Sequence, residues 1–145
     1  MWLALAYDRL GQKDRAFVHY DSARTHLLAV IDSFPAVLPF YSDLAITYAG
    51  VGREGEALEL GRSTVDQSED DAFWGPSHRR DFARTLTILG LHDQALDQIE
   101  YLLSIPGPGL WISPARLWLD PEWVPLRDHP RFQALLEKYA DDVEH

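Results

Sequence analysis

Apolar positions recur at helical spacing in three parts of the chain, and each such stretch ends in a glycine. In the second part, Leu44, Ala45 and Tyr48 lie on one face of a helix, and Gly52 follows. Glycine enters the left-handed conformation with little strain, so it often ends a helix. Ala57 comes five residues later and begins a second apolar stripe, where a small side chain lets two helices pack closely. The pattern therefore predicts a pair of antiparallel helices.

The same pattern occurs three times in the same order, in residues 3–23, 44–64 and 82–103. The equivalent positions are Leu3, Leu44 and Phe82; Ala4, Ala45 and Ala83; Tyr7, Tyr48 and Leu86; Gly11, Gly52 and Gly90; and Ala16, Ala57 and Ala95. We therefore predict one all-α domain over residues 1–145. Its three helix hairpins are expected at approximately 1–34, 38–68 and 77–104.

These copies resemble the tetratricopeptide repeat, a helix–turn–helix unit marked by small and aromatic residues at fixed positions. The first copy matches best, with Leu3, Ala4, Tyr7, Gly11, Ala16, Tyr20 and Ala23. The second has Tyr41 in the leading aromatic position but Gly61 in the later one, and the third has Arg79 and Ile99 there. The resemblance implies a right-handed solenoid in which the first helix of each hairpin lines a concave face.

The copies are spaced 41 and then 38 residues apart, whereas a typical repeat has about 34. We expect the first surplus to lengthen the second helix, up to Pro35, and the second to form a linker in which Gly75 and Pro76 break the helix. The leading aromatic position of the first copy would fall before Met1. Either the chain belongs to a longer array of repeats or its first helix is naturally short.

The residues after the third copy predict a different kind of segment, because PGPG (106–109) interrupts the helical pattern. Ser113, Asp120 and Asp128 each precede a proline by one or two residues and are expected to cap short helices. An amphipathic stripe follows at Phe132, Leu135, Leu136 and Tyr139, and Trp118, Trp123 and Leu126 are candidates to pack against the repeats. We predict a helical cap over 113–140 that covers the apolar end of the last hairpin.

The charged residues of this segment fit the same structural role. Glu122 is expected to favour the positive start of a helix, and Arg127 and Arg131 to be solvated or ion-paired. The run LWLDPEWVPLRDHPRFQALL resembles the ending of the tetratricopeptide region in many large bacterial regulatory proteins. Such proteins often carry a Ser/Thr kinase, an adenylate cyclase or a winged-helix module. The catalytic motifs of those enzymes do not occur in this sequence.

Charge and composition narrow the range of partners. The formal net charge is −10, so phosphate backbones and anionic lipid surfaces repel the chain, and neither nucleic acid nor membrane is an expected partner. No cysteine is present, which excludes disulfides, thiolate catalysis and cysteine-ligated metal centres. No apolar run approaches the roughly 20 residues that span a bilayer. A cytoplasmic protein is the resulting expectation.

Candidate chemistry is sparse. His19 and His26 lie two turns apart on one predicted helix, which is too far for one metal ion. His78 and His92 are near expected helix starts, where solvated or capping roles are anticipated. We therefore predict no catalytic residue, no metal site and no cofactor. A small helical enzyme or metal-binding protein remains only as a remote alternative.

A binding groove is the better candidate site. By helical phase, the side chains expected to face the concave surface are Leu5, Asp8, Arg9, Ser42, Asp43, Ile46, Ala49, Arg80, Arg84 and Thr87, with Ser77 beside them. Arg80 and Arg84 are one turn apart and could hold a carboxylate between them. The alternative is that they pair with Asp81 and glutamates of this acidic chain. The family's carboxylate-clamp pattern requires Lys and Asn at comparable places, and it is absent.

Three hypotheses for function follow. The first is a protein-interaction or scaffold module, the C-terminal part of a larger bacterial regulator, that binds a peptide or protein in the groove. The second is self-association through the first helix, where Trp2, Leu3 and Leu5 supply apolar surface. The third is the remote alternative of an enzyme or a metal-binding protein.

Overall fold

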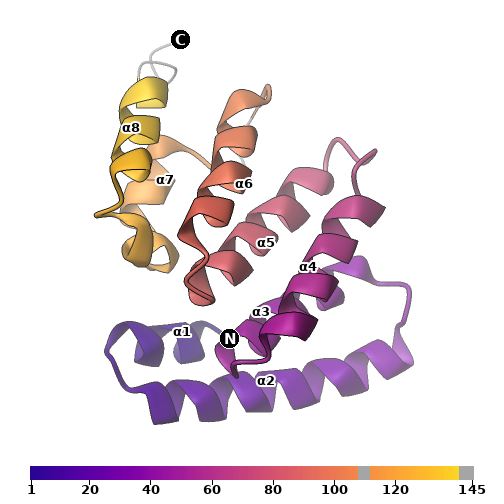
Figure 1. The fold of residues 1–145 in the computed structure, drawn as a ribbon. Helices are drawn as coiled ribbons and strands as arrows, with labels where there is room; N and C mark the ends of the chain where they lie inside the picture. The colour runs from indigo at the N-terminus through magenta and orange to yellow at the C-terminus, as the bar shows by residue number, and fades with distance from the viewer. Residues whose placement is uncertain (108–111, 141–145) are drawn as a thin grey trace.

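A computed structural model describes residues 1–107 and 112–140, and all regular structure in these two ranges is helical. The predicted all-α class is therefore confirmed for the described residues. Figure 1 shows the helices folding back on one another from the N-terminus to the C-terminus. They are α1 (Trp2–Arg9), α2 (Lys13–Ser33), α3 (Leu38–Gly50), α4 (Glu54–Gln67), α5 (Gly75–Ile88), α6 (His92–Ser104), α7 (Pro114–Leu119), the 3-10 helix η2 (Pro121–Leu126) and α8 (Pro130–Tyr139).

The three predicted helix pairs share one local geometry. Helices α1 and α2, α3 and α4, and α5 and α6 pack in pairs, and α2 also packs on α3 as α4 does on α5. Gly11, Gly52 and Gly90 have φ values of +72°, +80° and +77°, so each connection uses the left-handed conformation that glycine permits. The alanines at the equivalent close approaches are all buried: Ala4, Ala45, Ala83, Ala16, Ala57 and Ala95. The three copies therefore repeat in structure as well as in sequence.

One of the two predicted helix boundaries is correct and the other is not. Helix α2 ends at Ser33, before Pro35, as expected. Gly75 and Pro76, however, begin α5 rather than break a helix. Proline is tolerated in the first turn because the N–H that it lacks would have no helical partner there. The carboxylate of Asp71 accepts hydrogen bonds from the backbone N–H groups of Phe73 (3.0 Å) and Trp74 (2.8 Å), which shapes the turn before α5.

Successive helix pairs meet by placing a large ring against a glycine. A Cβ atom on Gly50 of α3 would overlap the ring of Tyr20 on α2. A Cβ atom on Gly61 of α4 would lie 2.5 Å from Cδ2 of Phe82 on α5. Both rings are buried. The two contacts between neighbouring pairs therefore depend on the absence of a side chain at one position.

Two glycines of the same helix test this packing. We expect Gly61→Ala to destabilise the protein by about 1–3 kcal/mol, because the added methyl group must displace the buried ring of Phe82. Gly55 also lies in α4, but a Cβ atom there meets nothing within 4 Å. Gly55→Ala should stabilise the protein by roughly 0.5–1 kcal/mol through its higher helix propensity. Denaturant unfolding of both variants measures the difference, and equal effects would contradict the packing described for Gly61.

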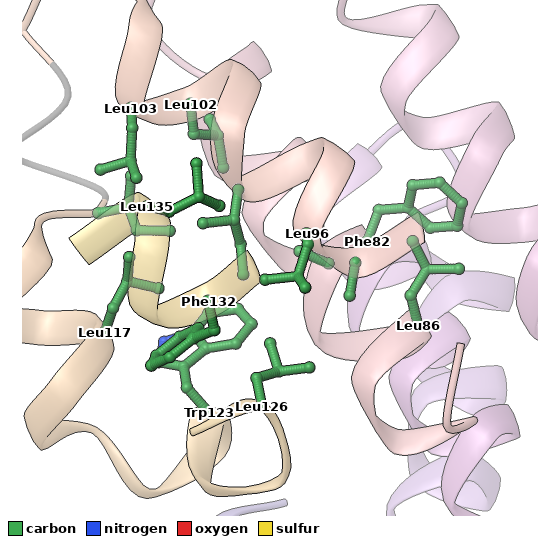
Figure 2. Close-up of a cluster of buried hydrophobic side chains, with 14 residues drawn as sticks. Phe82, Leu86, Leu96, Leu102, Leu103, Leu117, Trp123, Leu126, Phe132 and Leu135 are labelled. Atoms are coloured by element: carbon green, nitrogen blue, oxygen red, sulfur yellow. The ribbon is translucent and has the colours of Figure 1, made fainter. Parts of the chain in front are cut away.

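The C-terminal segment, residues 112–140, packs against the third helix pair. Helix η2 contacts α5, α8 contacts α6, and α7 contacts both η2 and α8. Figure 2 shows side chains of this segment gathered against those of α5 and α6. Its buried members are Ile112, Leu117, Trp123, Leu126, Phe132 and Leu135, which form one cluster with Phe82, Leu86 and Leu96 among others. The expected burial of Trp123 and Leu126 is confirmed, whereas Trp118 is exposed and that prediction is wrong.

The starts of the short helices confirm one predicted side-chain cap and correct two others. Ser113 Oγ accepts a hydrogen bond from the backbone N–H of Arg116 at 3.2 Å, as an N-cap should. Asp120 occupies the N-cap position of η2 but makes no capping bond with its side chain. The N-cap of α8 is His129 rather than Asp128, because Pro130 is the first helical residue, and His129 Nδ1 accepts from Arg131 N–H at 3.2 Å. Asp128 therefore has no capping role.

Candidate binding surface

Arg84 of α5 joins three parts of the chain. Its Nε lies 2.7 Å from Oε2 of Glu122 in η2, and its Nη1 lies 3.2 Å from Oδ1 of Asp81. Its guanidinium carbon is 5.0 Å from the ring centroid of Trp2 in α1, within the range of a cation–π contact. The side chains of Arg84 and Glu122 are only 11% and 9% exposed. The ion pair is therefore nearly shielded from water.

Arg80 shares the same carboxylate. Its Nη2 lies 3.2 Å from Oδ1 of Asp81, the atom that Arg84 also contacts. Of the two alternatives for this arginine pair, the structure has the internal one, with Asp81 and Glu122 as partners. Arg80 and Arg84 do not form an open fork around which an external carboxylate could bind.

Burial has the largest effect on the pKa values of Glu122 and Asp43, two acidic groups near Arg84. Burial raises the pKa of Glu122, and the Arg84 guanidinium only partly opposes this. Burial also raises the pKa of Asp43 in α3, with repulsion from Asp81 adding to the effect and Arg84 opposing it. Both carboxylates therefore cost the fold some stability when they are ionised, despite the nearby arginines.

This arrangement predicts an unusual dependence of stability on pH. A carboxyl group with a raised pKa in the folded state stabilises the fold below its ordinary pKa, 4.5 for Glu122, and this contribution is lost as pH rises through the folded pKa. The variant Glu122→Gln lacks this pH-dependent contribution to stability, because the glutamine side chain does not titrate. We expect the free energy of unfolding of the wild type, relative to Glu122→Gln, to increase as pH falls from 7 towards 5.

Comparing the two proteins at each pH cancels the contributions of the other titrating groups to the free energy of unfolding. Among these is His78, whose pKa is lowered by burial and which destabilises the fold as pH falls. Urea unfolding at several pH values gives the difference. A difference that stays constant, or that shrinks as pH falls, would show that Glu122 is not disfavoured in its charged form.

Half of the residues predicted to face the groove are instead buried in the packing. They are Leu5, Ser42, Ile46, Ala49 and Thr87, and the neighbouring Ser77 is also buried. Ser42 Oγ lies 2.7 Å from Nδ1 of His78, and Thr87 Oγ1 donates to the Ala83 carbonyl oxygen at 2.8 Å. The prediction for His78 was a solvated or a capping role near a helix start. His78 is instead buried and hydrogen-bonded to Ser42, and the N-cap of α5 is Trp74.

The two remaining charged residues of the predicted groove interact locally. Asp8 Oδ1 lies 2.5 Å from Nζ of Lys13, and Arg9 Nη2 lies 3.6 Å from Oδ2 of Asp8. Neither residue contacts the Arg84–Glu122 pair in these interactions. The ten predicted groove residues therefore do not form one open site. Five are buried, Asp8 and Arg9 form one group of ion pairs, and Arg80 and Arg84 belong to another.

The space enclosed near Arg84 is small. A cavity of about 10 Å³ lies between α1, α2, α3, α5 and η2. Its lining includes Trp2, Tyr20, Arg84 and Glu122. That volume holds about one water molecule, whereas pockets for small ligands usually measure about 300–1,000 Å³.

Tyr20 is the most enclosed polar group of this cavity. Its hydroxyl makes no hydrogen bond to a described residue, and burial raises its pKa to about 12. The hydroxyl is therefore neutral at physiological pH. A peptide or metabolite could not enter beside it unless Trp2 or Glu122 moved.

Exposed apolar side chains are numerous on the first helix pair. Leu3 and Ala6 of α1 and Leu10, the C-cap of this helix, lie at i, i+3 and i+7 in the sequence, and all three are exposed. We call these three residues the α1 stripe. Other large exposed apolar residues of this helix pair and the turn after it are Trp2, Phe17, Val18, Leu28 and Phe34. Sequence reasoning singled out Leu3 but did not identify the stripe.

Other candidate chemistry is not assembled in the described parts of the chain. Within residues 1–107 and 112–140, no three His, Asp or Glu side chains are placed to hold a metal ion. His19 stacks on Tyr7 with ring centroids 5.2 Å apart, and His26 is exposed. Over the same residues, no helix has both the length and the apolar character needed to cross a bilayer.

Sequence reasoning missed two members of the Arg84 site. The sequence predicts Glu122 at a helix start, which matches its place in η2 but does not indicate its ion pair, and it indicates Trp2 only as a surface for self-association. No local pattern indicates that residues 2, 84 and 122 meet, since the contact depends on how η2 returns to α5. No protein-family model, curated protein or solved structure matches this chain.

Proposed function

We propose that this chain is a tetratricopeptide-like protein-interaction module, in which three helix hairpins stack into a short solenoid. The observation that carries this proposal is the threefold repetition of one geometry. Each copy has a glycine with positive φ, and each has a buried alanine on both helices. Arrays of such hairpins present extended surfaces to proteins and peptides. A scaffold role within a larger bacterial regulator, in the cytoplasm, is part of the same proposal.

The C-terminal segment fits the role of a cap in this proposal. A stack of hairpins leaves an apolar face at its last repeat, and that face requires a cover. Phe132 and Leu135 of α8 and Trp123 of η2 are buried in one cluster with side chains of α6. In the proposed function, residues 113–140 therefore serve stability and solubility rather than chemistry.

The partner's position is better supported on the α1 stripe than in the concave groove. The groove arginines already bind internal carboxylates, and the cavity beside them holds about one water. The α1 stripe, in contrast, exposes two leucines, and Leu10 is 69% exposed. Exposed apolar surface of this kind marks interaction sites on soluble proteins.

Affinity capture from cells followed by mass spectrometry would test this function with three matched baits. The wild type is compared with a stripe variant, Leu3→Asp with Leu10→Asp, and with a groove variant, Arg80→Gln. Thermal melting of each bait controls for unfolding. We expect partners that the wild type and Arg80→Gln retain and that the stripe variant loses. Loss only with Arg80→Gln would favour groove binding, and identical protein sets for all three baits would contradict a specific interaction module.

Self-association is a second candidate, favoured by the exposure of Trp2 and Leu3. Leu5, the third residue of that hypothesis, is buried and cannot contribute. Sedimentation equilibrium over a wide concentration range decides this candidate. A monomeric mass at the highest concentration would eliminate it, whereas a dimer that the stripe variant abolishes would establish it.

A further inference from the structure

The α1 stripe has two internal counterparts whose neighbours are known. The aligned positions are Leu44, Thr47 and the C-cap Val51 at α3, and Phe82, Thr85 and the C-cap Leu89 at α5. Thr47 and Thr85 are buried, and Val51 and Leu89 are partly buried. Leu44 and Phe82 are 4% and 7% exposed, whereas Leu3 at the equivalent position is 52% exposed. This face is therefore buried in the second and third hairpins and exposed in the first.

The second helix of the preceding hairpin contributes to the cover at both internal faces. Phe82 meets Gly61 of α4, the helix that precedes α5. Val51 packs against the cluster that contains Ala16 and Tyr20 of α2, the helix that precedes α3. Helix α2 packs on α3 and α4 packs on α5. Figure 1 shows α4 next to α5.

We propose that the α1 stripe is the docking surface for a helical hairpin of the same kind, carried by a partner and laid across α1 through its second helix. This inference rests on the proposed function and specifies the partner's chemistry. The docking helix must be apolar along one side. The α4–α5 junction, where Gly61 of the covering helix lies against Phe82, is the template for a small residue opposite Leu3. The other arrangement, Tyr20 of the covering helix against Gly50, does not apply, because Arg9 stands at the position equivalent to Gly50. A polar helix or an extended peptide would leave Leu3 and Leu10 without matching contacts.

A second copy of this chain fits the surface less well. The face of α6 that would continue the stack is already covered, because Ile99 and Leu102 are buried in a cluster with Phe132 and Leu135 of α8. Two α1 stripes facing each other would place leucine against leucine. At both internal junctions a large ring meets a glycine instead. A separate hairpin with a small residue therefore matches the geometry better than a twofold contact does.

The second hairpin of the chain can serve as the docking partner in a test of this proposal. A copy of residues 38–79 placed directly before Met1 continues the alignment, since residue 80 is equivalent to residue 1 and Phe82 to Leu3. The copied α4 would then bring its own Gly61 opposite Leu3. We expect the extended chain to unfold in one cooperative transition at a higher temperature. Amide exchange within α1 should slow by about tenfold or more, as expected for a helix that becomes covered.

Leu3→Asp, made in both the original and the extended chain, is the control. In the original chain Leu3 is largely exposed, so the substitution should hardly shift the melting temperature. In the extended chain it should remove most of the gain and restore fast exchange in α1. Two separate transitions, or an equal effect of Leu3→Asp in both chains, would overturn the inference. A wild-type dimer abolished by Leu3→Asp would also overturn it, by placing a second copy on the stripe. None of these results decides whether cells contain a protein partner, which the capture experiment addresses separately.

Discussion

Phe132→Ala is expected to destabilise this protein by about 3–5 kcal/mol, the usual cost of removing a fully buried aromatic side chain. Phe132 lies in α8 but belongs to the cluster that holds α6, α7 and η2 together (Figure 2). Its removal leaves a cavity that neighbouring Leu117, Trp123 and Leu126 cannot fill without shifting. Because the same cluster contains side chains of α5 and α6, the loss should affect global unfolding rather than only the end of the chain.

Chemical denaturation with a second aromatic substitution as control measures this effect. Trp118→Ala removes a larger ring from the same segment, but Trp118 is exposed, so its cost should stay below about 1 kcal/mol. A loss below about 1 kcal/mol for Phe132→Ala would mean that the C-terminal segment does not stabilise the helix pairs. A transition confined to that segment, with the remainder unchanged, would lead to the same conclusion.

Arg84→Met is expected to cost about 3 kcal/mol or more, because it leaves the carboxylate of Glu122 buried without its partner. This expectation is far above the roughly 0.5 kcal/mol typical of surface charge changes. It follows from the 2.7 Å contact and the low exposure of both side chains. The cost should be smaller at pH 5 than at pH 7, since a Glu122 without Arg84 takes up a proton even more readily.

Replacing both partners distinguishes a buried ion pair from a general packing role of Arg84. The double variant Arg84→Met with Glu122→Leu removes both charges, and apolar replacement of a buried pair is often close to neutral. We therefore expect the double variant to be more stable than Arg84→Met alone. Additive losses in this double-mutant cycle would show that the two side chains act independently.

Local features of the fold could be predicted from the sequence wherever one short pattern determines the outcome. Gly11, Gly52 and Gly90 end their helices because positive φ favours glycine, and this requirement is visible in the sequence. The pattern also placed Phe132 and Leu135 on one buried stripe. Helix starts were less certain, since several residues before Pro130 could serve as the N-cap. Asp128 is the stronger capping residue by type, but Pro130 fixes the first helical position and makes His129 the N-cap.

The candidate site was predicted less well, because helical phase does not reveal what covers a face. Ile46 and Thr87 lie on the helices expected to line the groove, but side chains of neighbouring helices enclose them. Arg80 and Arg84 were identified correctly as carboxylate-binding groups, yet Glu122, the partner of Arg84, lies 38 residues further along the chain. Such a contact depends on the path of the C-terminal segment. Comparing equivalent positions of the three repeats, in contrast, identifies the α1 stripe, because its counterparts in the other two repeats are buried or partly buried.

The most direct test of the proposed interaction surface is site-specific photo-crosslinking in cells. A photoreactive amino acid replaces Leu10, on the α1 stripe, or Leu119, an exposed leucine of the C-terminal segment that serves as the control. We expect a discrete crosslinked partner from position 10 and none from position 119. Crosslinking from Leu119 but not from Leu10, or the same products from both positions, would contradict the claim that proteins bind this module through the stripe on α1.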